Sequence, residues 1–347
     1  MARVRFVDRV EELEALRGWC SVSRYCPLYI YGPEGCGKTR LVREFASRVS
    51  ELLGGDALAI YIDALEATDI GKAISLSPSI GIDLAKLALE ALPSSLASFG
   101  SLGAALASSI PSIVKVVAEK LTKSFLKGRN VVIVVDDVSR AIGLSKVEWY
   151  VKWLSELMER LAEEYELRVM NIVVTTSEGT SLDLVSRHRH AEVRLLWNMD
   201  KRSFEELFKE LNPPQNVDFE TVWKLLGGNP GKLMELATRF QWNLDEMIES
   251  YTYRITKVIE NIKTPNSISK LLELAKDISK AEEEIDEEMK KLIDYLIDRN
   301  LLIYKKWLLL THKPFTNQDP ELGIGEKYAW QVPLYRELVM KALSKHL

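Results

Sequence analysis

The chain has 347 residues, which exceeds the usual size of one domain and predicts two or three. Its 47% hydrophobic and 28% charged residues are typical of a globular protein. A net charge of −4 argues against a surface that binds nucleic acid over its whole extent, although it leaves room for a local basic patch.

The cysteines, the N-terminal residues and the longest uncharged window indicate the cellular compartment to expect. Cys20, Cys26 and Cys36 show no C-x-x-C spacing, so we expect a reduced, cytoplasmic interior without disulfides or a zinc site. The N-terminal residues carry charges and lack an apolar segment, which predicts no signal peptide. The uncharged window at 91–114 contains serines, prolines and glycines and is too polar and too broken to predict a membrane span.

The first predicted element is an amphipathic helix at 10–19, preceded by Phe6-Val7-Asp8-Arg9. Asp8 and Glu11 have the spacing of a capping box, in which each side chain satisfies a backbone N–H group of the first turn. We expect this helix to cover a sheet edge.

A phosphate-binding loop is predicted next. Residues 32–39 match G-x-x-x-x-G-K-[ST] in full, between an apolar run at 27–31 and a helical pattern at 40–53. In such a loop the glycines let backbone N–H groups surround phosphates, Lys38 reaches the β- and γ-phosphates, and Thr39 offers its hydroxyl to Mg²⁺. The nucleotide-binding residues predicted here are Gly32, Pro33, Glu34, Gly35, Cys36, Gly37, Lys38, Thr39 and Arg40.

The next strand is predicted at 57–62 and is followed by an insertion at about 65–129, rich in Ala, Ser and Leu. We expect two or three short helices there, packed on the core or reserved for a protein partner. An exposed apolar hairpin for self-association is the alternative interpretation.

Acidic residues end a second buried strand. Five β-branched or aliphatic residues at 131–135 predict a strand buried on both faces of a parallel sheet, and Asp136 and Asp137 follow directly. At that position Asp136 is expected to complete the Mg²⁺ shell, and Asp137 to orient or deprotonate water.

The pattern continues with a helix at 145–165 and strands at 169–176 and 192–196. Thr175 and Thr176 end the first of these strands, where a hydroxyl can bond the γ-phosphate or the attacking water. Equally, a threonine can be there because β-branched residues favour strands.

Residues 200–262 have helical periodicity, which predicts helices at 200–211, 218–226, 232–240 and 243–262. The break Gly227-Gly228-Asn229-Pro230-Gly231 has the composition of a hinge, because the glycines are permissive and the proline starts a helix. An ordinary break between two helices is the alternative.

The C-terminal residues predict helices at 267–279 and 286–299, strands at 301–304, 307–310 and 328–332, and a closing helix from 334. Helices followed by a hairpin suggest a winged helix. Lys305, Lys306, His312 and Lys313 would lie near its wing, where they could contact phosphates or form a solvated surface.

In this order the segments resemble archaeal P-loop ATPases of the AAA+ and STAND type. The resemblance rests on the segments 6–9, 32–39, 131–137, 173–177 and 227–231, with a looser match beyond them. It implies an α/β fold with a parallel-sheet P-loop core at 1–198, a helical lid at 199–263 and a winged-helix domain at 264–347.

The resemblance also implies roles for residues. Phe6, Val7 and Arg9 would contribute to an adenine pocket that Pro230 closes. Thr175 or Thr176 would sense the γ-phosphate and act with Lys38 and Asp137 in catalysis.

Two departures from the family pattern affect the expected rate. The strand ends Asp136-Asp137 where many relatives have Asp-Glu, so the shorter side chain predicts slow hydrolysis. Glu178 stands where many STAND members carry an arginine, and Arg187 and Arg189 are the nearest later candidates for a γ-phosphate contact.

We therefore expect a Mg²⁺-dependent protein that binds ATP and ADP and acts as a slow ATPase and conformational switch. One alternative is a DNA-binding regulator that uses the winged helix, which the net charge does not support. Another is an interaction scaffold that holds nucleotide without hydrolysing it. No membrane partner is expected.

Overall fold

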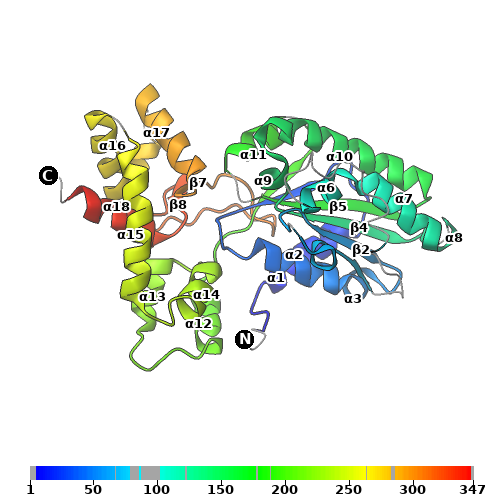
Figure 1. Ribbon diagram of the computed structural model, residues 1–347, viewed down its shortest axis with the longest axis horizontal. Coiled ribbons are helices and arrows are strands. Elements are labelled where there is room, and N and C mark those ends of the chain that lie inside the picture. The colour runs from blue at the N-terminus through cyan, green and yellow to red at the C-terminus, as the bar shows by residue number, and fades with distance from the viewer. Residues whose placement is uncertain are drawn as a thin grey trace.

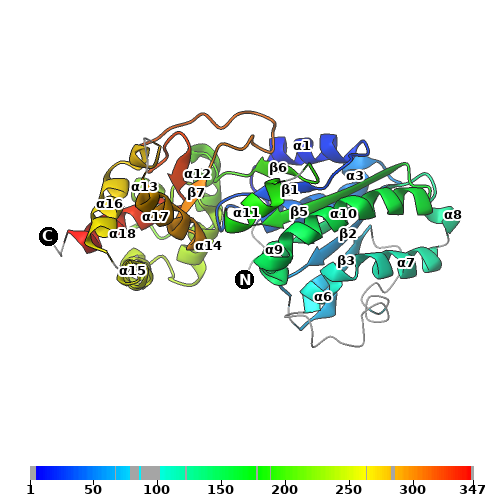
Figure 2. The ribbon, with the colours of Figure 1, turned by 90° about the horizontal axis from the view of Figure 1, so that it is seen from above.

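The computed structural model describes residues 5–344 except 67, 79–85, 87–101, 122, 177–178, 188, 263 and 283–285. Among these residues, six strands form one sheet with helices on both of its faces (Figures 1 and 2). The strands are β1 (Leu28–Tyr31), β2 (Leu58–Asp63), β3 (Ile74–Ser77), β4 (Asn130–Asp136), β5 (Val169–Thr176) and β6 (Glu192–Leu195).

The strand order is β3-β2-β4-β5-β1-β6, and all neighbours pair in parallel except β2 and β3. The five parallel strands confirm the strands predicted from the sequence. Because they are parallel, their carboxyl ends meet at one edge of the sheet. The loop that follows β1 lies at that edge, with β5 between β1 and β4.

Helices cover the two faces because the central strands are apolar on both sides. One face carries α1 (Val10–Cys20), α2 (Lys38–Ser47) and α3 (Val49–Leu53). The other carries α9 (Val138–Ile142), α10 (Leu144–Glu164) and α11 (Gly179–Ser186).

The insertion at 65–129 contains the predicted short helices and one strand that was not predicted. Its helices are α4 (Ile70–Ala73), α6 (Leu102–Ser108), α7 (Ile110–Leu121) and α8 (Lys123–Leu126). The interpretation of this segment as helical only was wrong, since β3 pairs antiparallel with β2 and forms the sheet edge. The apolar hairpin proposed for self-association lies largely outside the described residues.

The helices predicted at 200–262 are confirmed, and their assignment as a lid, the name kept for them below, stays a prediction. They are α12 (Lys201–Glu210), α13 (Phe219–Leu226), α14 (Pro230–Thr238) and α15 (Leu244–Glu260). Each begins after a residue whose side chain accepts a bond from a first-turn N–H group: Asp200, Asp218, Asn229 and Asn243.

The C-terminal elements also follow the prediction, with one difference. They are α16 (Pro265–Lys276), a 3₁₀ helix η2 (Ile278–Ala281), α17 (Glu287–Asp298), β7 (Leu302–Tyr304), β8 (Tyr328–Trp330) and α18 (Pro333–Leu343). Strands β7 and β8 form a two-stranded antiparallel sheet. The strand predicted at 307–310 does not join it, and the winged-helix assignment stays a prediction.

Residues 308–310 instead extend the large sheet. Leu309 forms a parallel bridge with Leu195 of β6, and the Leu195 N–H donates to Leu308 O at 2.8 Å. The Leu310 N–H donates to Leu195 O at 2.8 Å. The long connection between β7 and β8 therefore crosses to the large sheet, as seen from above in Figure 2.

The lid and the C-terminal helices share one hydrophobic core. Leu226 and Leu233 of the lid belong to the same buried cluster as Leu271, Leu296 and Leu338. The domain boundaries at 198 and 263 stay predictions, but the second does not separate two hydrophobic cores. Among the described residues, no helix combines the length and the hydropathy that crossing a membrane requires.

Candidate functional site

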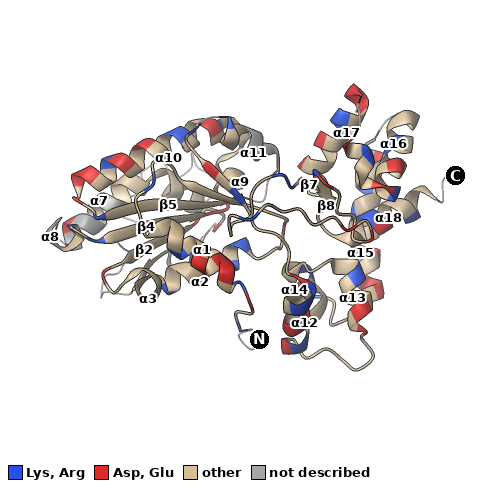
Figure 3. Cartoon of the chain, turned by 180° about the vertical axis from the view of Figure 1, so that it is seen from behind, with Lys and Arg blue, Asp and Glu red and all other residues tan. Residues whose placement is uncertain are grey.

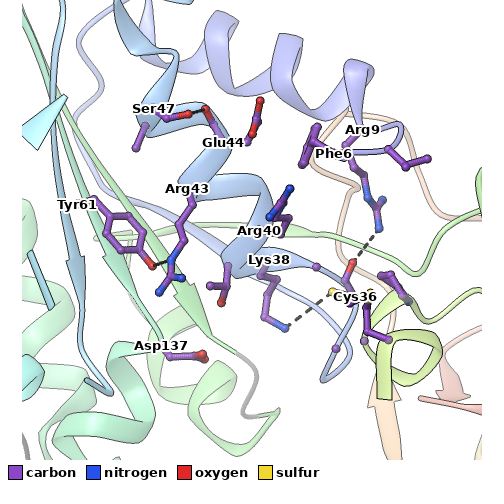
Figure 4. A pocket seen from close by; sticks show the side chains of 18 of the residues that line it. Phe6, Arg9, Cys36, Lys38, Arg40, Arg43, Glu44, Ser47, Tyr61 and Asp137 are labelled. Carbon is purple, nitrogen blue, oxygen red and sulfur yellow. Dashed lines mark hydrogen bonds between the residues drawn. The ribbon is translucent and has the colours of Figure 1, made fainter. Parts of the chain in front are cut away.

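A cavity of about 940 Å³ lies at the carboxyl ends of the parallel strands, between the phosphate loop, the N-terminal segment and the lid. The predicted site residues that line it are Phe6, Val7, Arg9, Glu34, Gly35, Cys36, Gly37, Lys38, Thr39, Arg40, Asp137 and Pro230 (Figure 4). The other predicted residues, Gly32, Pro33, Asp136, Thr175 and Thr176, do not line it.

The phosphate loop is closely packed and internally bonded. The Lys38 ammonium donates to the carbonyls of Gly32 at 2.8 Å and Pro33 at 3.0 Å, so it lies at the base of the loop. Lid residue Gly231 touches the loop directly, because its N–H donates to Gly35 O at 2.8 Å. A Cβ at Gly231 would lie 2.7 Å from the Gly35 Cα, so the approach requires glycine.

Arg9 holds the same loop from the other side. Its guanidinium donates to Cys36 O at 3.0 Å and to Trp197 O at 2.7 Å, and it pairs with Glu12 at 2.7 Å. Figure 4 shows the side chain reaching the loop from the N-terminal segment. The structure therefore places Arg9 as a brace of the loop backbone as well as a lining residue of the cavity.

Asp136 accepts hydrogen bonds from three hydroxyl groups. Tyr61 OH donates to Oδ2 at 2.7 Å, Thr175 Oγ1 donates to Oδ1, and the Thr39 hydroxyl is a third donor. Burial and the negative charge of Asp137 raise the pKa of the Asp136 carboxyl, and the three hydroxyls oppose that shift.

The pair of Thr39 and Asp136 fits a magnesium site of the kind that nucleotides complete. Mg²⁺ is usually held by one or two carboxylates together with substrate phosphates and water. Among the described residues, no three His, Cys, Asp or Glu side chains gather into a cage of protein ligands alone. The residues present suit an ion held jointly with phosphates.

Asp137 has the backbone conformation that turns its side chain toward the cavity. Its φ of 54° and ψ of 38° lie in the left-handed region, which aspartate tolerates better than most residues. Its N–H donates to Thr175 Oγ1 at 2.9 Å. Thr175 thus joins both acidic residues, while the roles of Thr175 and Thr176 as phosphate sensors stay predictions.

The lid gives the cavity an apolar lining. Phe6 and Val7 line it from the N-terminal segment, as predicted, and Pro230 lines it from the lid. The sequence did not identify the other apolar lining residues, which are Ala46, Leu76, Met199, Leu207 and Met234. Met199, Leu207 and Met234 lie on the segment after β6, on α12 and on α14, so no single periodic pattern joins them.

A second group of lining residues was also missed. It comprises Arg43, Tyr61, Lys72, Ser75 and Ser77. Ser75 and Ser77 were missed because β3 was not predicted, and Tyr61 because an aromatic residue within an apolar strand is typical of a core. Arg43 donates to Tyr61 OH at 2.8 Å and pairs with Asp63 at 2.7 Å.

The candidate γ-phosphate arginines do not line the cavity. Arg187 lies 3.8 Å from Glu148 and is exposed, as is Arg189. Ser177 and Glu178 fall outside the described residues.

The glycine pair that precedes Asn229 is closely packed. Gly227 and Gly228 have φ values of 56° and 78°, in the left-handed region that glycine adopts readily. A Cβ at Gly227 would lie 2.6 Å from Pro333 Cδ, and one at Gly228 would lie 2.0 Å from Met199 O. The break therefore contacts both α18 and the segment after β6.

Similar solved structures include the Aeropyrum pernix ORC2 protein in ADPNP and ADP complexes, with 14% identity over 99% of this chain and 97% of that one and a TM-score of 0.43. AMPPCP-bound DnaA from Aquifex aeolicus has 16% identity, coverage of 85% and 88%, and a TM-score of 0.37. A structure that describes katanin self-assembly has 11% identity, coverage of 96% and 89%, and a TM-score of 0.37.

A search of curated proteins found no match. A family model described as an ATPase domain predominantly from Archaea matches residues 6–236, which is more than half of the chain and spans every segment of the cavity lining except Arg5. The chain belongs to this family of P-loop ATPases.

Proposed function

We propose that the protein is a Mg²⁺-dependent ATP-binding protein and slow ATPase whose nucleotide state sets the position of the lid and the C-terminal helices relative to the core. One observation carries the proposal: a single cavity is lined by the phosphate loop, by Asp137 and by lid residues Pro230, Gly231 and Met234. A nucleotide in this cavity would contact the core and the lid together.

Each residue has a distinct part in the proposed chemistry. Loop N–H groups and Lys38 would bind the phosphates, and Thr39 and Asp136 would hold Mg²⁺, which supplies positive charge to the reacting phosphoryl group. Asp137 would orient water, and its one-carbon-shorter side chain relative to glutamate supports slow turnover.

The lid supplies the proposed coupling. A ligand shifts a conformational equilibrium only as far as its affinities for the two conformations differ. Because lid residues line the cavity, ATP and ADP can differ in their contacts with the lid, which is the condition for a switch.

The test combines binding with turnover. Calorimetry with ATP and ADP, with and without Mg²⁺, should give measurable affinity, and phosphate release should be slow and lost on chelation of Mg²⁺. Binding without phosphate release would favour the scaffold alternative, and absence of binding would overturn the proposal.

The contacts of the wing residues weigh against the DNA-binding alternative. The Lys305 side chain is buried and its Nζ donates to Asn317 O at 2.9 Å. Lys306 pairs with Glu326, and Lys313 pairs with Glu11 at 2.7 Å. Helices α16 and α17 carry both signs of charge (Figure 3), so the described surface there forms no uniform basic stripe.

A further inference from the structure

The backbone of Glu34, in the phosphate loop, is bonded at both its N–H and its carbonyl by side chains from distant segments. Its N–H donates to Gln331 Oε1 at 2.9 Å, and its carbonyl accepts from Asn229 Nδ2 at 2.9 Å. Gln331 directly follows β8, and Asn229 caps the lid helix α14. The loop is thus bonded to the lid and to the C-terminal region at one residue.

Asn198 closes these contacts into a ring. It follows β6, donates from Nδ2 to Gln331 O at 3.1 Å, and accepts at Oδ1 from Asn229 Nδ2 at 3.0 Å. Four hydrogen bonds therefore run through Glu34, Gln331, Asn198 and Asn229 and return to Glu34. The ring joins the loop, the sheet, the lid and the C-terminal region.

The three amide side chains of the ring are buried, while Glu34 is partly buried at the cavity. Asn198, Asn229 and Gln331 are 7%, 0% and 3% exposed. A buried polar group that loses its partner incurs the cost of its removal from water. A fully bonded buried network therefore favours one geometry over its neighbours, and displacement of any segment breaks several bonds together.

The remaining atoms of these amides are also used. Asn229 Oδ1 accepts from the Lys232 N–H at 3.0 Å, and Gln331 Nε2 donates to Leu302 O at 3.3 Å. Asn229 and Gln331 are thus each bonded both to Glu34 and to their own region, which links α14 and the β7–β8 sheet to Glu34.

We propose that Gln331 and Asn198 are positioning residues of the phosphate loop, and that the carboxamide ring couples nucleotide in the loop to the lid and the C-terminal helices. This inference rests on the proposed function. Coupling between two sites is reciprocal in free energy, so a residue that transmits nucleotide state must also affect nucleotide affinity.

Gln331→Met tests the ring, because methionine has a similar length and neither accepts from Glu34 nor donates to Leu302. We expect ATP affinity to fall roughly tenfold, which corresponds to one or two lost hydrogen bonds. In wild type, a non-hydrolysable ATP analogue and ADP should give different hydrogen exchange in α17 and α18. In the variant this difference should disappear.

Asn171→Ala is the matched control. Asn171 is a fully buried amide on β5 that donates to Val22 O at 3.0 Å and does not line the cavity. Its loss should lower the melting temperature without a change in the nucleotide response. Asn198→Leu removes the two ring bonds of Asn198, to Gln331 O and from Asn229 Nδ2. It is the variant to measure if Gln331→Met does not fold.

The outcomes separate the two proposals. Wild type that does not bind ATP would overturn the proposed function. Wild type that binds and responds, together with ring variants that keep the same affinity and the same exchange difference, would overturn only the coupling role of the ring.

Discussion

The hydroxyl of Tyr61 donates a 2.7 Å hydrogen bond to Oδ2 of Asp136, and it accepts a 2.8 Å bond from Nε of Arg43. Tyr61, whose position in an apolar strand predicts only a place in the hydrophobic core, thus orients the carboxylate proposed to hold Mg²⁺. The cation of Arg43 strengthens the donor, since a hydrogen bond polarises the next one in a chain.

Tyr61→Phe should weaken the binding of Mg²⁺ in the site. Without the hydroxyl, Oδ2 of Asp136 loses a buried donor, and only Thr175 and Thr39 remain to orient the carboxylate. We expect the Mg²⁺ concentration for half-maximal hydrolysis to rise several-fold, with a smaller change in ATP affinity measured without metal. Tyr29→Phe is the control, because the buried Tyr29 hydroxyl has no partner among the described residues. Equal Mg²⁺ titrations for both variants would exclude the role of Tyr61.

Asp137→Asn should bind Mg²⁺-ATP as wild type does but turn over roughly 100-fold more slowly, the scale of a lost general base. Asparagine tolerates the left-handed backbone of this position, so the loop geometry should persist. Single-turnover hydrolysis measures the effect. Asp56→Asn, which removes a partly exposed carboxylate that pairs with Arg168 and does not line the cavity, should retain turnover. An unchanged hydrolysis rate in Asp137→Asn would show that another residue activates the water.

Lys38→Ala should abolish measurable ATP affinity, because the phosphates lose their charged donor. The folded state should lose only about 1 kcal/mol per hydrogen bond to Gly32 and Pro33, so the thermal melt should shift by a few degrees. Lys72→Ala removes an exposed cation from the same cavity and should bind ATP nearly normally. Retained affinity in Lys38→Ala would refute the phosphate-loop assignment.

Leu310→Asp should release the 305–327 connection from the core. Leu310 is buried beside β6, and an unpaired charge there is strongly unfavourable. Trypsin should then cleave at Lys306 and Lys313 at least tenfold faster, an estimate that follows from the cost of burying the charge. Leu308→Asp is the matched control, since the Leu308 side chain is 40% exposed. Equal cleavage of both variants would show that this connection is not held by Leu310.

Local sequence patterns predicted most of the fold. Periodicity and the length of apolar runs located the parallel strands and the lid helices, and the loop motif located Lys38 and Thr39. The short edge strand β3 has only four residues, and its pairing with β2 rather than its composition makes it a strand.

The unpredicted parts of the site depend on contacts between distant segments. Gln331 lies 297 residues from Glu34 and belongs to no motif. Residues 307–310 have strand character, but their partner is β6 rather than the nearby hairpin. Sequence separation of this size leaves no local periodicity or spacing from which the contact can be inferred.

The most direct test of the switch is the distance between the core and the C-terminal helices in different nucleotide states. Spin labels at Lys152→Cys on α10 and Lys291→Cys on α17 occupy exposed positions, while the native cysteines are buried. Pulsed electron paramagnetic resonance should give different distance distributions with ADP and with a non-hydrolysable ATP analogue, and Gln331→Met should remove the difference. Identical distributions in the apo, ADP and ATP-analogue states would contradict the switch and leave a static ATP-binding protein.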